Sequence, residues 1–239
     1  MPSIFNNKFL LILTLFLTVT GCSNTFKHVG GMLKQSIVGL PDDNIPAAEI
    51  DNSPYSSIYA RINNSHNVYV LLALVEAPQT FPATTIQAQN AELKWISSDA
   101  GMLVTRHGRL LKTVNFFYGD RINISSEQID PLMLGLHLNS TPLQWTSTID
   151  WQPGYHINYE QRSTFSFVSD ETITINEKPL TLKKFNEHVV VPHLDIEYDN
   201  QFWIDASNGM VIKSNQKIAP NLPYIEITLL KPYEFKDNK

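Results

Sequence analysis

A short stretch in the C-terminal part of the chain alternates polar and apolar residues. Its polar members are His193, Asp195, Glu197 and Asp199. A continuous strand would turn all four side chains to one face. Carboxylate oxygens are the ligands that hard cations prefer, so this face could form a metal site or bind a basic ligand. Side chains on one strand repeat about every 7 Å, so all four cannot reach one ion unaided. The pattern therefore favours a solvent-facing strand surface, and we predict no metal.

Aromatic rings and arginines form a second group with chemical potential. Trp145, Trp151 and Tyr155 surround a Pro-Gly turn, and the flat face of such rings can stack on the apolar side of a sugar ring. Arg106 and Arg109 flank another turn, where their guanidinium groups could face an acidic polysaccharide. We predict these five residues as ligand contacts. The competing interpretation is that the rings pack in the core and the arginines are solvated charges.

Sequence motifs of enzymes are missing from the chain. It has no Gly-x-Ser-x-Gly elbow, no His-Glu-x-x-His helix, no phosphate-binding glycine loop and no dinucleotide fingerprint. We therefore predict a protein that is not an enzyme and that uses no cofactor. A pair of carboxylates for glycoside hydrolysis stays open, because two such groups need only be about 5–10 Å apart in space.

The only cysteine, Cys22, follows a segment typical of a secretory signal. Lys8 precedes an apolar run over residues 9–17, which is shorter than the roughly twenty residues that span a bilayer. Small residues then lead to the cysteine, an arrangement that resembles the bacterial lipoprotein signal, in which the thiol is alkylated by diacylglycerol. An ordinary signal peptide with an incidental cysteine is the alternative. Ser23 stands where an aspartate would favour inner-membrane retention, so we predict an outer-membrane anchor on the periplasmic side.

The signal sets the predicted organisation of the chain. Residues 1–21 are the signal peptide, 22–53 a lipidated tether, and 54–239 one β-rich periplasmic domain. Within the tether, an apolar stripe from Phe26 to Leu40 at three- and four-residue steps predicts a short helix. Loop is predicted from Pro41 to Pro54.

Composition narrows the class of protein. Hydrophobic residues make up 43% and charged residues 17% of the 239, with a formal net charge of −5. This composition excludes a disordered acidic tail, and the mild acidity argues against nucleic acid as a partner. A single cysteine excludes both an intramolecular disulfide and a cysteine-based zinc site.

Strand signals dominate from Tyr55 onward. Short apolar runs alternate with turns, and two of them form similar hairpins, Leu93–Thr105 and Phe202–Ser214, each with Trp-Ile before a glycine turn. Other strands are predicted over 56–62, 66–76, 109–114, 143–151, 156–168, 172–175, 188–198 and 224–230. One helical stretch is expected at 127–138. The pattern predicts an all-β fold with a single antiparallel meander sheet, curled into a half-barrel, a barrel or a sandwich.

Three segments together resemble one known family. They are the stretch from Pro54 to Ile62, the stretch from Trp95 to Leu110, and the C-terminal part with Trp203-Ile204-Asp205, Gly209-Met210-Val211 and Pro220–Pro223. In this order they resemble the GfcB/YjbF lipoproteins of capsule and exopolysaccharide operons. The resemblance implies an outer-membrane-anchored periplasmic protein of antiparallel β architecture that takes part in assembly or export of surface polysaccharide. It brings no agreed catalytic residues.

The resulting hypothesis is a non-enzymatic accessory lipoprotein that contacts polysaccharide or export-machinery proteins. Two alternatives stay open. One is a carrier or chaperone that shelters a hydrophobic ligand, such as a lipid or a lipid-linked glycan, in the concavity of the sheet. The other is a glycan-cleaving enzyme that uses a facing pair of carboxylates.

Overall fold

The computed structural model describes residues 42–77 and 90–234. The predicted signal peptide, Cys22 and the apolar stripe from Phe26 to Leu40 lie outside the described residues. The compact unit that carries the fold begins at Asp42. Within the described ranges, no helix is both long enough and apolar enough to cross a bilayer.

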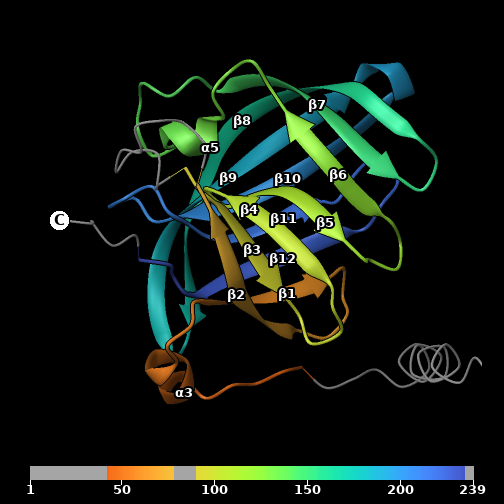
Figure 1. Ribbon diagram of the computed structural model, residues 1–239. Helices are drawn as coiled ribbons and strands as arrows, with labels where there is room; N and C mark the ends of the chain where they lie inside the picture. The colour runs from red at the N-terminus through yellow and green to blue at the C-terminus, as the bar shows by residue number, and fades with distance from the viewer. Residues whose placement is uncertain (1–41, 78–89, 235–239) are drawn as a thin grey trace, which may run out of the picture. The chain divides into compact units, whose positions relative to one another are not determined.

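Twelve strands form one antiparallel sheet, which curls into a nearly closed barrel (Figure 1). The sheet order is β5-β4-β3-β2-β1-β12-β11-β10-β9-β8-β7-β6, so every neighbouring pair except β1 and β12 is also consecutive in sequence. The all-β meander predicted from the sequence is therefore confirmed. The strands are β1 (Ser57–Ile62), β2 (Val68–Glu76), β3 (Glu92–Ile96), β4 (Met102–Arg106), β5 (Arg109–Val114), β6 (Asp120–Ser125), β7 (Gln144–Gln152), β8 (His156–Ile175), β9 (Lys178–Val191), β10 (Ile196–Ile204), β11 (Val211–Lys217) and β12 (Tyr224–Lys231).

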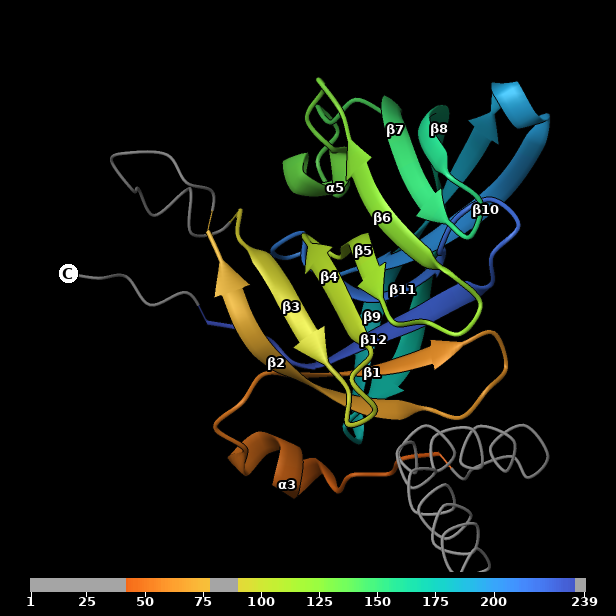
Figure 2. The same cartoon turned by 45° about the vertical axis from the view of Figure 1, so that its right-hand side comes forward.

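The two edge strands, β5 and β6, lie next to each other (Figure 2), and hydrogen bonds of their side chains join them. The Thr113 hydroxyl donates to Asp120 Oδ1 at 2.9 Å and accepts the Arg121 N–H at 3.0 Å. Asp120 also accepts the backbone N–H groups of Asn115 and Phe116, each at 3.1 Å. These bonds satisfy edge groups that would otherwise be unpaired, so the seam is closed without a full backbone ladder.

Arg121 adds hydrogen bonds at the same seam from the interior of the sheet. Its side chain is buried, and its guanidinium donates to the carbonyl oxygens of Leu110, Lys217 and Ile218. Burial is the main reason that the pKa of Arg121 falls to about 10, and the charge on Arg109 lowers it further. A buried cation held only by carbonyl dipoles costs desolvation energy, which the surrounding core must offset.

The two largest apolar clusters of the described residues lie in the interior. One is built around Trp95, Leu110, Ile149, Trp151 and Ile225, and the other around Trp145, Phe165, Phe185, Phe202 and Ile204. Inward-facing positions on a curled sheet alternate with outward ones, so each strand contributes side chains to this core. The concavity that a hydrophobic-ligand carrier would need is thus occupied by the protein's own side chains.

The tryptophans of the two similar hairpins are buried and hydrogen-bonded within the protein. Trp95 on β3 donates its indole N–H to Thr105 Oγ1 at 2.8 Å, and Trp203 on β10 donates to Glu171 Oε2 at 2.7 Å. Both rings are buried. A buried indole needs an acceptor for its N–H; the partner strand of the hairpin supplies it for Trp95, and β8, outside the hairpin, supplies it for Trp203.

The helices differ from the sequence prediction. The loop predicted over 41–54 contains α3 (Ala47–Asn52), whose Ile50 packs against Ile175 and Leu230. A helix of six residues is too short to show apolar periodicity. The helix predicted over 127–138 is limited to α5 (Pro131–Leu134), which Asp130 caps and Gly135 ends at a φ of 90°.

The strand predicted over 188–198 is also wrong. β9 ends at Val191, Pro192 begins a 3-10 turn (Pro192–Leu194), and Asp195 adopts a left-handed φ of 52° before β10 begins. Proline has no N–H to donate to the ladder, and at Pro192 the chain leaves β9 for the 3-10 turn. The separate strands predicted over 156–168 and 172–175 are one strand, β8, and β6 was not predicted.

Candidate functional site

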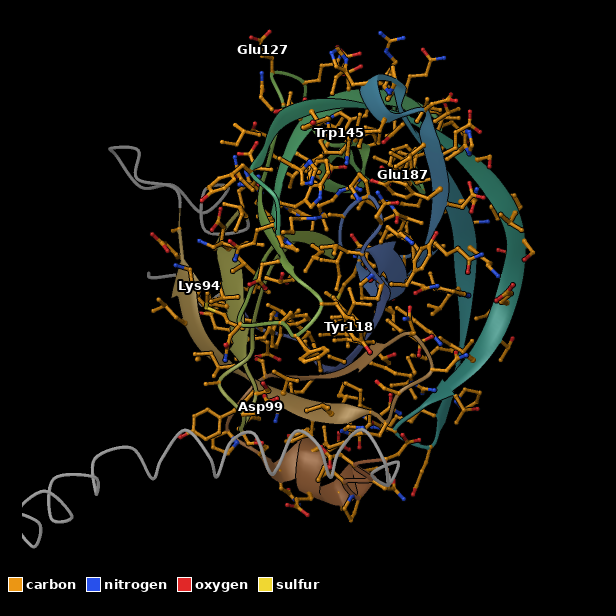
Figure 3. The ribbon with its side chains drawn as sticks, turned by 90° about the vertical axis from the view of Figure 1, so that its right-hand side faces the viewer. Lys94, Asp99, Tyr118, Glu127, Trp145 and Glu187 are labelled. Atoms are coloured by element: carbon orange, nitrogen blue, oxygen red, sulfur yellow. The ribbon has the colours of Figure 1, made fainter. Side chains whose placement is uncertain are left out.

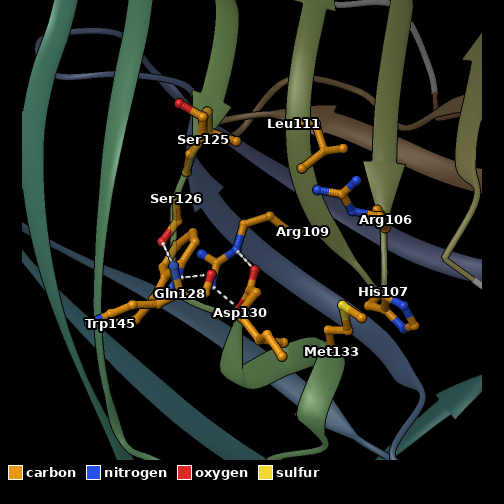
Figure 4. Close-up of a pocket in the computed structure, with 12 residues that line it drawn as sticks. Arg106, His107, Arg109, Leu111, Ser125, Ser126, Gln128, Asp130, Met133 and Trp145 are labelled. Carbon is orange, nitrogen blue, oxygen red and sulfur yellow. Dashed lines mark hydrogen bonds and ion pairs between the residues drawn. The ribbon is translucent and has the colours of Figure 1, made fainter. Parts of the chain in front are cut away.

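A pocket opens where β5 and β6 separate at one end of the sheet (Figure 4). Its walls come from the β4–β5 turn, the end of β6, the segment before α5, and β7. The cavity volume is about 130 Å³. The lining residues are Arg106, His107, Arg109, Leu111, Ile124, Ser125, Ser126, Gln128, Ile129, Asp130, Met133 and Trp145.

Arg109 organises this pocket through two carboxylates. Its Nε and Nη2 donate to Asp130 Oδ2 and Oδ1 at 2.7 and 3.0 Å, a bidentate pair. Its Nη1 donates to both oxygens of Glu187, at 2.9 and 2.7 Å. Asn200 also donates to Glu187 Oε2, at 2.8 Å. Each nitrogen of the guanidinium is therefore engaged within the protein.

The Arg109 side chain is buried and lies among aromatic rings. Its guanidinium carbon lies 4.6 Å from the centre of the Trp145 ring and 5.3 Å from that of Phe202. Burial by itself lowers the pKa of Arg109, but the attraction of Asp130 and Glu187 outweighs it, and the net pKa is raised. Arg109 therefore keeps its charge, and the pocket floor is an ion-pair network in which one guanidinium is held between two carboxylates. Figure 3 shows Trp145 and Glu187 within the space that the sheet encloses.

The polar wall is held by hydrogen bonds between the segment before α5 and β7. Ser126 Oγ donates to the Thr146 carbonyl at 2.6 Å, and the Thr146 N–H donates to Gln128 Oε1 at 2.9 Å. Trp145 donates its indole N–H to the Gln128 carbonyl at 3.4 Å. Hydroxyl and amide groups are therefore held in place at the pocket, beside the edge of an aromatic ring.

The rim carries the cationic side chain with the most freedom. The Arg106 side chain is 38% exposed and lies 3.9 Å from Glu92, a loose surface pair. His107, in the β4–β5 turn, contacts Asn90 Oδ1 through Nε2 at 2.8 Å. Burial is the main cause that lowers the pKa of His107, so the imidazole is neutral at pH 7.

The structure brings together three of the five predicted ligand contacts. Arg106, Arg109 and Trp145 line this pocket. Trp151 is buried in the other core cluster, stacked on His156 with ring centres 4.2 Å apart. Tyr155 is 98% exposed in the β7–β8 turn. The competing core interpretation therefore describes Trp151, and the guanidinium of Arg109 is not free to pair with an outside anion.

Glu187 and Asp130 were missing from the predicted site. Glu187 lies 78 residues from Arg109 in the chain, and Asp130 lies 21 residues away. No spacing pattern in the sequence connects such positions, because the closure of the barrel brings them together. Arg109 began a predicted strand, but Glu187 lay just before the strand predicted over 188–198, so the sequence analysis contained no signal that pairs them.

The alternating acidic stretch does not form a shared face. His193 and Asp195 lie in the turn after β9, whereas Glu197 and Asp199 lie on β10. His188 of β9 contacts Asp199 at 3.0 Å and Glu197 at 3.6 Å, and all three side chains are exposed. Among the described residues, no three His, Cys, Asp or Glu side chains gather as a metal site would require.

Comparison with known proteins identifies the family. The model of the family described as "Group 4 capsule polysaccharide lipoprotein gfcB, YjbF" matches residues 30–230. The chain belongs to this GfcB/YjbF family. The family resemblance drawn from the three sequence segments is therefore confirmed.

Individual relatives support the assignment along nearly the whole chain. This family member is 30% identical over 224 residues to the uncharacterized lipoprotein GfcB of Escherichia coli K12, covering 93% of this chain and 98% of that protein. It is 28% identical over 222 residues to the uncharacterized lipoprotein YjbF of the same strain, covering 92% and 96%. The crystal structure of the hypothetical lipoprotein YmcC from E. coli K12 matches with a TM-score of 0.67 and 30% identity, covering 81% of this chain and 92% of that one. The GfcB/YjbF chain is thus a lipoprotein of a capsule-polysaccharide family.

Proposed function

We propose that this GfcB/YjbF lipoprotein is anchored through Cys22 to the periplasmic side of the outer membrane and supports assembly or export of a capsular or extracellular polysaccharide. Membership of a capsule-polysaccharide lipoprotein family is the observation that carries the proposal. The apolar run before Cys22 and the small residues beside it resemble the signal for lipidation, and the Cys22 thiol would carry the lipid of the anchor.

In this proposal the pocket beside Arg109 contacts the glycan. Arg109 is paired with two carboxylates, so the floor offers no free cation, and Arg106 on the rim supplies the freer positive charge. Ser126 and Gln128 offer hydroxyl and amide groups to sugar hydroxyls, and the edge of Trp145 offers an apolar wall. A cavity of about 130 Å³ is smaller than the roughly 300–1,000 Å³ of a typical small-molecule site. It therefore suits contact with one unit of a long chain.

The same geometry argues for a role without catalysis. A glycoside hydrolase needs one carboxyl group that gives up a proton and a second that stabilises charge or activates water. Asp130 and Glu187 at this pocket are both hydrogen-bonded to Arg109, and Glu187 is fully buried. Glu187 is closed off from the pocket by its burial, and both oxygens of Asp130 are bonded to Arg109, so the two do not form the acid and nucleophile pair that hydrolysis needs.

The test is deletion of the gene, followed by complementation with variants and measurement of the amount and chain length of surface polysaccharide. We expect the deletion to reduce the amount of surface polysaccharide or to shift its chain length. The double variant Arg106→Ala/Gln128→Ala should restore the parental amount and length only partly. Arg162→Ala is the matched control, because Arg162 is an exposed arginine on β8 outside the pocket, with a side chain 66% exposed.

Three outcomes would count against parts of the proposal. Unchanged polysaccharide after deletion would contradict the role itself. Full complementation by the double variant at normal protein level would contradict the glycan contact at the pocket. A Cys22→Ser variant that still fractionates with the outer membrane would contradict the anchor.

A further inference from the structure

Six turns gather at one end of the sheet, because consecutive antiparallel strands reverse direction there. They connect β1 to β2, β3 to β4, β5 to β6, β7 to β8, β9 to β10, and β11 to β12. We call this the aromatic end. It faces the viewer in Figure 3, where Tyr118 is labelled. The pocket beside Arg109 lies at the opposite end, at the β4–β5 turn and the β6–β7 segment.

Two neighbouring turns of the aromatic end expose large apolar side chains. Phe117 and Tyr118 in the β5–β6 turn are 80% and 57% exposed, and Tyr155 and Ile157 at the β7–β8 turn are 98% and 69% exposed. The rings of Phe117 and Tyr118 pack edge to face with centres 5.2 Å apart. Such a group of exposed rings is uncommon on a soluble surface and marks a contact site.

The two turns touch at a glycine. Gly119 has a φ of 126°, and a Cβ at this position would lie 2.3 Å from the carbonyl oxygen of Gln152 and 2.7 Å from Pro153 Cδ. Gln152 also donates to Asp120 Oδ2 at 3.4 Å. The exposed side chains of both turns are thus carried on adjoining backbone, which holds them at one end of the sheet.

The described chain also begins at the aromatic end. Asp42 accepts the Asn67 N–H at 2.7 Å, and the Asp43 N–H donates to the Asn67 carbonyl at 3.0 Å, directly after the β1–β2 turn. Asp43 accepts the Tyr69 N–H at 2.7 Å. Asp42 is the twentieth residue after Cys22, and a segment of that length spans at most about 70 Å. A lipid on Cys22 would therefore hold the membrane within reach of this end.

Charge at the aromatic end fits a lipid surface bound through rings. The six turns contain no lysine or arginine; the fixed charges at this end are Asp99 and Asp195 in the turns and Asp42 and Asp43 beside them. Anionic lipid binders carry clustered basic residues, whereas tyrosine and other aromatic rings sit at the headgroup level of any bilayer. The turn segments are 63–67, 97–101, 115–119, 152–155, 192–195 and 218–223.

We propose that the aromatic end rests on the lipid surface, with Phe117, Tyr118, Tyr155 and Ile157 inserted among the headgroups. This inference rests on the proposed anchor at Cys22. It fixes the orientation of the protein, because the pocket at the opposite end then points away from the membrane into the periplasm. A glycan could reach the pocket without approaching the bilayer.

The chain is suited to a direct test by site-specific labelling. Cys22 is the only native cysteine, and a lipidated sulfur does not react with a thiol label. The variants Phe117→Cys and Tyr155→Cys place a single reactive thiol at the aromatic end. Leu138→Cys is the matched control, because Leu138 is also apolar, is 48% exposed and lies at the opposite end. Each full-length lipidated variant is labelled with an environment-sensitive fluorophore and reconstituted into vesicles of phosphatidylethanolamine and phosphatidylcholine.

We expect the labels at positions 117 and 155 to shift to the blue, to be quenched by brominated lipid and to lose quenching by aqueous iodide. The label at position 138 should keep its aqueous spectrum. Protein that stays on the vesicles with all three labels equally open to iodide overturns the orientation alone. Lipid quenching at position 138 in place of 117 and 155 does the same. Protein that stays in the supernatant, or that takes label at Cys22, overturns the anchor and this inference together.

Discussion

Removal of the Arg109 guanidinium should destabilise the fold strongly. The side chain is 3% exposed and Glu187 is 0% exposed, so Arg109→Met leaves a carboxylate that water cannot reach. Asn200 would be the remaining side-chain donor to Glu187 among the described residues. Breaking a buried ion pair by removing one partner costs about 3–5 kcal/mol. We expect the free energy of unfolding to fall by about that amount.

The double variant Arg109→Met/Glu187→Leu removes the unpaired carboxylate as well as the guanidinium. It therefore distinguishes the cost of an unpaired buried charge from the cost of the lost side-chain contacts of Arg109. Replacement of a buried ion pair by apolar side chains of similar volume is often close to neutral. The methionine can still pack against Trp145, which lies over the guanidinium in the parent. We therefore expect the double variant to be more stable than Arg109→Met alone, with Asp130 kept hydrated by its partial exposure.

Urea unfolding followed by tryptophan fluorescence measures both effects. With a slope near the upper end of about 1–3 kcal/mol per molar urea, Arg109→Met should lower the midpoint by about 1–2 M. Arg162→Met is the control, because its pair with Glu160 is exposed and such pairs contribute about 0–1 kcal/mol. An Arg109→Met midpoint close to that of the control would refute the reasoning, as would a double variant less stable than the single one.

Two further predictions concern the β4–β5 turn. Burial lowers the pKa of His107, so the unfolded chain takes up a proton first as the pH falls through about 6.5, and stability should decrease below that pH. His107→Gln should reduce the loss of stability at low pH, measured as the difference between the urea midpoints at about pH 7.5 and about pH 5.5. An unchanged difference would contradict the role of His107 in that loss. Gly108→Ala should cost about 2–4 kcal/mol, because φ is 79° and the new Cβ would lie 2.4 Å from Val211 Cβ. In the control Gly101→Ala the nearest atom to the new Cβ is the Ser97 hydroxyl oxygen, at 2.9 Å, which can rotate away, and a thermal melt that shows equal losses for both glycine variants would disprove the steric argument.

The strand pattern was predictable where local chemistry determines it. Asp205 to Gly209 provides a turn between two apolar runs, and the hairpin of β10 and β11 forms as the sequence predicts. Pro192 shows the limit of the same approach, since alternation continued past it while its missing N–H ended β9. α3 was not predicted, because its single buried residue, Ile50, contacts β8 and β12, which are far away in the sequence.

The ligand contacts were predicted by residue type, and the fold then separated them. Arg106, Arg109 and Trp145 share a pocket because the β4–β5 turn lies against β7 across the seam. Trp151 and Tyr155 lie only four residues apart in sequence, yet one is 4% and the other 98% exposed. Sequence spacing could not distinguish them, because the turn after β7 reverses the chain between the two side chains.

The sequence by itself determined the antiparallel β class, the family and the lipoprotein character of the chain, because alternation, turn residues and a cysteine after an apolar run are local signals. The tertiary structure alone decided that Arg109 is neutralised by Asp130 and Glu187, and that Phe117 and Tyr155 share one end of the sheet. Both results depend on how twelve strands curl and meet at the β5–β6 seam. Closure of a sheet joins residues far apart in the chain, and no local pattern records which residues will meet.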